Sequence, residues 1–236
     1  MSALEDDRSQ TAEQVEAQFV ALMGNDLGRL FFALRGELVW LSTARDEFLT
    51  LFDRGPKRYK LLTKAAPDFF DLVFDMMVNQ TLIQIARVTD PARSLVKGQG
   101  PSENVSIRGL PTLVDTSIRT AVQDRVDEIM KDAENLRDIR NRRIAHRDLL
   151  TAFGQHPKPL IPTDREQINA IIEKLQHLFN QIYKFYFNSN MIFTFHWSGG
   201  AEALVTVLEE GMRSFRAQDS GIRRLVGISD DETGDA

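Results

Sequence analysis

Apolar residues recur at intervals of three and four along most of the chain, which predicts a protein that is helical nearly throughout. A first helical region covers about residues 11–52, with a break near Gly24-Asn25-Asp26. A second helix covers about residues 67–88, and its apolar circumference indicates a central place in a bundle. It ends at Thr89-Asp90-Pro91, because proline disfavours helical geometry in the residue before it.

The second half of the chain continues the helical pattern after a glycine- and proline-rich loop at 98–111. We expect helices at about 111–118, 119–149, 163–187 and 199–216, with Thr163 and Glu166 forming a capping box at the third start. Residues 154–162 form a proline-rich connector, and the single strand-like run is 191–196. One short strand makes no sheet, so the fold class is all-α: a helical bundle with a long helix at 119–149 and additional C-terminal helices.

The two ends of the chain differ from the rest. We expect residues 1–10 to form a flexible acidic N-terminus, residues 11–217 a single helical domain, and residues 218–236 a tail that is acidic from about 229. Hydrophobic (42%) and charged (27%) content are typical of a soluble globular protein. The absence of cysteine excludes disulfides, thiolate zinc sites and a cysteine nucleophile. With no signal peptide and no membrane span, the sequence predicts a cytoplasmic protein without a membrane partner.

Charge is concentrated at one place. The net charge is −5, but the two acidic ends carry most of the negative excess. Residues 137–147 hold five arginines (Arg137, Arg140, Arg142, Arg143 and Arg147) against one acid, Asp138. The protein therefore has a basic spot despite its acidic total, and the distribution matters more for nucleic-acid binding than the sum.

Arg140 lies within the apolar stripe of the 119–149 helix. On a helical wheel the apolar residues within about 40° of it are Val126, Ile129, Ala133, Leu136 and Ile144. Because a desolvated, unpaired guanidinium is costly, Arg140 either forms a buried ion pair or faces a polar cleft. In the simplest alternative, the arginines form a solvated helix end that complements the helix dipole.

The order Arg140-Asn141, four further residues and then His146 resembles the signature of the HEPN domain family. The flanking run 144–148 is similar to the abortive-infection, AbiU-like branch of that family, and so is the segment 82–91. The resemblance covers roughly residues 25–190. It implies a helical bundle that dimerises and places two copies of the motif in one cleft.

Many HEPN proteins are metal-independent ribonucleases, so the resemblance implies cleavage of RNA through its own 2′-hydroxyl, with no metal and no cofactor. His146 then acts as acid and base, Arg140 clamps the phosphate, and Asn141 orients His146 or holds the backbone. The expected RNA- or phosphate-binding residues are Arg142, Arg143, Arg147 and Arg87. For Arg87 an i,i+3 ion pair with Asp90 is the alternative. The biological setting implied is phage defence or a toxin, with RNA as substrate, a homodimer, and an antitoxin or regulatory protein as a further partner.

Two features complicate this assignment. Arg140 and His146 lie about 120° apart and about 9 Å apart along a straight helix, so they share a site only if the helix ends or kinks, or if both protomers contribute. Asp148 stands where a subset of HEPN toxins carries a modifiable tyrosine, so that control is not supported. The alternatives are a non-catalytic HEPN-like module that binds a nucleotide or a partner protein, and a structural protein with Arg140 in a buried ion pair.

Overall fold

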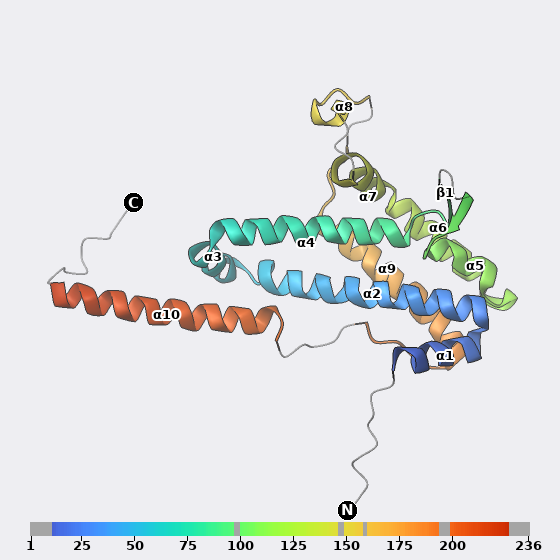
Figure 1. Cartoon of the computed structure of the whole chain (residues 1–236), viewed down its shortest axis with the longest axis horizontal. Coiled ribbons are helices and arrows are strands. Elements are labelled where there is room, and N and C mark those ends of the chain that lie inside the picture. The colour runs from blue at the N-terminus through green and yellow to red at the C-terminus, as the bar shows by residue number, and fades with distance from the viewer. Residues whose placement is uncertain (1–10, 97–99, 146–148, 158–159, 194–198, 227–236) are drawn as a thin grey trace, which may run out of the picture. The chain divides into compact units, whose positions relative to one another are not determined.

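The computed structural model describes residues 11–96, 100–145, 149–157, 160–193 and 199–226, and it is all-α apart from one hairpin (Figure 1). The α-helices are α1 (Ala12–Met23), α2 (Asn25–Phe52), α3 (Pro56–Ala65), α4 (Pro67–Val88), α5 (Leu110–Leu113), α6 (Thr116–Asp132), α7 (Glu134–Ile139), α8 (Leu149–Ala152), α9 (Arg165–Phe187) and α10 (Ala201–Val226). A 3-10 turn, η1 (Ile107–Gly109), precedes α5, and a π-helical segment, η2 (Arg140–Ala145), follows α7. The hairpin pairs β1 (Arg93–Val96) with β2 (Gly100–Glu103) in antiparallel register.

The predicted break in the first helical region is confirmed. Thr11 caps α1 in a capping box, since its hydroxyl accepts from the Gln14 N–H and the Gln14 side chain accepts from the Thr11 N–H. Gly24 ends α1 with φ +83°, a conformation that favours glycine, and α2 begins at the next residue. α4 has the bounds that the sequence predicts.

The sequence pattern missed α3. Pro56 occupies the first turn of α3, where its missing N–H costs nothing. The helix is short and basic, so its apolar periodicity is weak. Only Leu62 is buried in it.

The expected strand is wrong for residues 191–193, which have no regular secondary structure and pair with no described strand. Met191 and Phe193 are buried and Ile192 is exposed, and the Met191 N–H donates to Asn180 Oδ1 at 2.7 Å. The alternation that suggested a strand therefore marks an irregular segment packed on the core. Residues 194–196 lie outside the described residues. The strands that do form fall in and beside the loop expected at 98–111.

The long helix expected at 119–149 is broken into α6, α7 and η2. Ala133, with φ −81° and ψ −1°, is both the C-cap of α6 and the N-cap of α7. The start of α9 is also one residue from its expected place, because Asp164 is the N-cap and accepts from the Gln167 N–H at 2.7 Å. Thr163 instead bonds the Gln167 side chain, so the predicted capping box with Glu166 does not form.

The chain, for which we expected one domain over 11–217, divides into two compact units. Unit 1 comprises residues 1–45 and 78–195, and unit 2 comprises residues 46–77 and 196–236, each taken over its described part. The core of unit 1 is built chiefly from α2, α4, α6 and α9; its largest fully buried side chains are Phe31, Phe179, Leu34, Leu41, Ile85, Ile107, Leu110, Ile129, Leu136, Ile171, Ile172 and Leu175. Within unit 1, α2 and α4 lie side by side (Figure 1).

Unit 2 has a smaller cluster of Leu51, Ala201 and Val205, against which Phe52, Leu61 and Met77 pack. The part of α4 in this unit corrects our expectation of a central helix, because Phe69, Leu72 and Met76 are all more than half exposed. Only the last two turns of α4, in unit 1, are mostly buried. None of the described helices has the length and apolarity needed to cross a membrane.

Two glycines of α2 provide a matched test of the packing in unit 1. A Cβ at Gly28 meets the Val20 backbone at 2.6 Å, whereas a Cβ at Gly36 has no neighbour within 4 Å. We expect Gly28→Ala to lower the midpoint of thermal unfolding, because α1 must move away from α2. Gly36→Ala should raise stability by about 1 kcal/mol through helix propensity. Equal shifts of the two variants in calorimetry would contradict this close contact between the helices.

Candidate functional site

Arg140 is paired with Asp90, 50 residues earlier in the chain. Its Nη2 lies 2.5 Å from Oδ1 and 2.6 Å from Oδ2 of the carboxylate. The two side chains are 21% and 30% exposed, so the pair is partly buried and still reaches the surface. The apolar stripe therefore accommodates its arginine through an ion pair rather than by leaving it unpaired.

Asp90 is held in place by its own backbone. It follows the C-terminus of α4, where the buried Thr89 hydroxyl donates to the Ile85 carbonyl at 2.7 Å. The Asp90 carbonyl accepts from the hydroxyl of Ser106, which is fully buried. On the next residue, the Pro91 carbonyl accepts from Asn104 Nδ2 at 2.7 Å. These bonds fix the position of the carboxylate through the main chain.

Both carboxylate oxygens of Asp90 bond the same nitrogen of Arg140. The two-nitrogen fork that usually joins arginine to a carboxylate is therefore not formed. The Nε atom is buried and has no hydrogen-bond partner among the described residues, and none of them accepts from Nη1 either. The guanidinium keeps donors that its partner does not use.

Arg140 opens the π-helical segment η2, a form of helix that is rare and often found at functional sites. Within it, Arg142 Nη2 bonds Asp138 at 2.8 Å and Arg142 Nη1 lies 2.7 Å from His156 Nδ1. Because a guanidinium only donates, this contact requires Nδ1 of His156 to be the unprotonated nitrogen. The structure therefore brings His156, from the proline-rich connector, to the motif.

Two further arginines lie near the pair. Arg137 Nη2 donates to the Met130 carbonyl at 3.0 Å, and Arg108 Nε donates to the Met130 sulfur at 3.3 Å. Burial lowers the pKa of Arg137, and repulsion by Arg108 and Arg140 lowers it further, while Glu134 and Asp90 oppose the shift. The negative charge of Asp90 therefore acts on the guanidinium of Arg137 as well as on that of Arg140.

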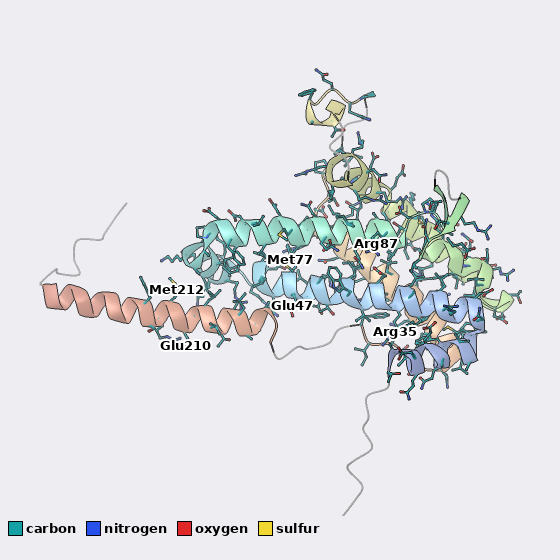
Figure 2. All side chains as sticks on the ribbon, viewed as in Figure 1. Arg35, Glu47, Met77, Arg87, Glu210 and Met212 are labelled. Carbon is teal, nitrogen blue, oxygen red and sulfur yellow. The ribbon has the colours of Figure 1, made fainter. Side chains whose placement is uncertain are left out.

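Arg87 does not form the i,i+3 ion pair with Asp90 that was the alternative to a role in RNA binding. Its Nη2 lies 3.5 Å from Glu37 Oε1 on α2, and the side chain is 58% exposed as it projects from α4 (Figure 2). Glu37 also accepts from Gln84, a buried polar residue one turn earlier on α4. Arg87 therefore presents most of its side chain to solvent, three residues from Asp90.

The remaining predicted site residues divide into two groups. Asn141 and Arg143 are exposed on η2. His146 and Arg147, with Asp148, lie outside the described residues. The structure brings Arg140 and Arg142 to defined acidic partners, and it leaves the roles of Asn141, Arg143 and His146 as predictions.

A family model described as AbiU2, of the HEPN domains, matches residues 24–203. The chain belongs to the AbiU2 family of HEPN domains. The match contains Asp90, Arg140 and His156, and also the first residues of α10. No curated protein and no solved structure matches the chain.

Sequence reasoning found Arg140 but missed Asp90 as its partner, and it missed Asp138 and His156 as partners of Arg142. Asp90 stood in a segment that resembles the family, yet nothing local distinguishes a carboxylate that pairs with Arg87 three residues earlier from one that pairs at long range. His156 carried no signal, because it lies in a connector without periodicity.

A double-mutant cycle measures the pair directly. We expect Asp90→Asn and Arg140→Met each to reduce the free energy of unfolding by about 1–3 kcal/mol, since each leaves a partly buried charge or polar group without its partner. The double variant should lose less than the sum of the single losses, by a coupling energy of about 0.5–3 kcal/mol in urea denaturation. Additive losses would show that the contact does not stabilise the protein.

Proposed function

We propose that this AbiU2-family HEPN domain is a metal-independent endoribonuclease that acts in phage defence or as a toxin. RNA supplies the nucleophile in its 2′-hydroxyl. His146 transfers the protons, Arg140 binds the scissile phosphate, and Asn141 positions His146 or the backbone at the cleft. Arg142, Arg143, Arg147 and Arg87 contribute to binding the RNA backbone.

The observation that carries the proposal is the incomplete pairing of Arg140. Asp90 engages Nη2 alone, and the donors on Nη1 and Nε have no described partner. A phosphate prefers two parallel N–H donors on different nitrogens of one guanidinium. Asp90 can therefore orient Arg140 through Nη2 while other donors of the same group bind a phosphate after a small movement of the side chain.

The surrounding charges favour an anion. The positive charges of Arg108 and Arg140 both act on Arg137 and lower its pKa. Arg143 is exposed on the same segment, and Arg87 is exposed near Asp90. Phosphate contacts from arginines of this kind supply most of the affinity in protein–nucleic acid complexes.

A second function has one observation in its favour. Both oxygens of Asp90 bond Arg140, and an acid so placed competes with a phosphate for the guanidinium. The domain would then be a non-catalytic module that binds a nucleotide or a partner protein, with the ion pair as a structural element. The two functions differ in whether RNA is cut.

The decisive assay is cleavage of total cellular RNA in the presence of EDTA. We expect the wild-type protein to cleave, and His146→Ala and Arg140→Ala each to be at least about 100-fold slower, since each removes a group from the reaction. The readout is the appearance of fragments over time, with unfolding midpoints measured in parallel.

The chain offers matched controls on exposed helix surfaces of unit 1. His177 on α9 is exposed, and Arg125 on α6 forms only an i,i+3 surface pair with Glu128. His177→Ala and Arg125→Ala should cleave at the wild-type rate. Intact RNA with the wild-type protein, or equal cleavage by all variants, would favour the binding module.

The position of the two motif residues leads to a prediction about dimers. If each site takes Arg140 from one protomer and His146 from the other, mixed dimers of the two inactive variants contain one intact site. Unfolding and refolding a mixture of Arg140→Ala and His146→Ala should therefore restore part of the wild-type rate. A cleaving monomer in a light-scattering measurement would contradict a shared site.

A further inference from the structure

Unit 2 contains a groove of its own, between α3 and α10. Its volume is about 300 Å³, and it is lined by Lys57, Lys60, Leu61 and Lys64 of α3 and by Glu209 and Met212 of α10. Figure 2 places Met212 on the side of α10 that faces α3, and Glu210 on the opposite side. The groove has an apolar floor of Leu61 and Met212 under a largely basic rim.

The three lysines form one stripe. At 100° per residue, Lys57, Lys60 and Lys64 fall within about 60° of one another on α3, at successive rises of about 4.5 and 6 Å. The segment 54–66 contains five basic residues and no acid. The stripe is therefore a linear array of positive charge along one edge of the groove.

These lysines have no hydrogen bond or ion pair with any of the described residues, although Glu209 lines the same groove. Their neighbour Arg58 behaves differently, because it is 12% exposed, donates to the Thr50 carbonyl at 2.7 Å and pairs with Glu202. The helix packs through Arg58 and Leu62 and leaves its lysines exposed toward the groove.

We propose that this groove is a second RNA-binding site, which holds the phosphate backbone of a single strand. The choice of RNA rests on the proposed ribonuclease function. A line of ammonium groups with no partner among the described residues is suited to a phosphate backbone, and surfaces that bind single strands add exposed aromatic side chains on which bases stack. Phe215 lies three residues from Met212 on α10 and is 70% exposed, so it is accessible to a base.

Substitution of Glu209 should change RNA affinity in the direction opposite to substitution of the lysines. A carboxylate in the groove repels phosphate, so Glu209→Gln should tighten RNA binding while lysine substitutions weaken it. A general loss of stability cannot produce both effects.

Binding is measured by fluorescence anisotropy with a single-stranded RNA of about 20 nucleotides, in full-length His146→Ala protein so that the RNA stays intact. We expect Lys60→Gln/Lys64→Gln to raise Kd about tenfold and to reduce the slope of log K against log salt by about 1.4 between about 50 and 200 mM. The matched control is Lys131→Gln/Lys184→Gln, which removes the same charge from exposed lysines of α6 and α9. It should change Kd by less than about twofold if binding requires the groove.

The outcomes separate this site from the proposed nuclease. In the background with His146 intact, the groove variant should raise KM for RNA and leave kcat unchanged. If the lysine pair and the control pair weaken binding equally, or if Glu209→Gln does not tighten it, the groove site is overturned even when the protein cleaves RNA. RNA binding through the groove without any cleavage would overturn the nuclease and keep the site. Equal affinity for polyglutamate would overturn RNA as the ligand in favour of an acidic peptide.

Discussion

The contact between Arg140 and Asp90 is the constraint on which the motif region depends. A positive charge within an apolar stripe is tolerated only if an opposite charge meets it. Asp90 can do so because hydrogen bonds of Thr89, Ser106 and Asn104 fix the chain on both sides of it. The end of α4, the turn that leads to α5 and the start of η2 are therefore held as one arrangement, and each of them supports the others.

The geometry of the pair determines which donors of Arg140 are used by Asp90. Asp90 restrains Arg140 at one nitrogen, which fixes the direction of the guanidinium without using all of its donors. Arg142 is restrained more fully, by Asp138 and His156. In the proposed nuclease, Arg142 would stabilise the segment while Arg140, oriented by Asp90, would bind the phosphate.

Much of the fold could be predicted from the sequence, because its signals are local. Gly24, Pro67 and Pro91 mark helix ends through backbone geometry alone, and the apolar periodicity of α9 is long enough to be unambiguous. The sequence also showed that Arg140 is a charged residue within an apolar helical stripe. The partner of Arg140 was not, because a contact across 50 residues leaves no local pattern, and α3 was missed because its few apolar residues give little periodicity. The division into two units could not be read from linkers, since α2 and α4 pass through both.

The discontinuity of unit 2 has a consequence for how the protein is made. Glu47, near the end of α2, accepts the N–H of Ala201 in the first turn of α10, across 154 residues of chain. The small cluster around Leu51 likewise needs Ala201 and Val205. During synthesis, residues 46–77 emerge long before α10 exists, so their apolar side chains remain without their final partners while unit 1 is being completed. Unit 2 therefore assembles only after α10 has been synthesised, and α3 acquires its groove at that point.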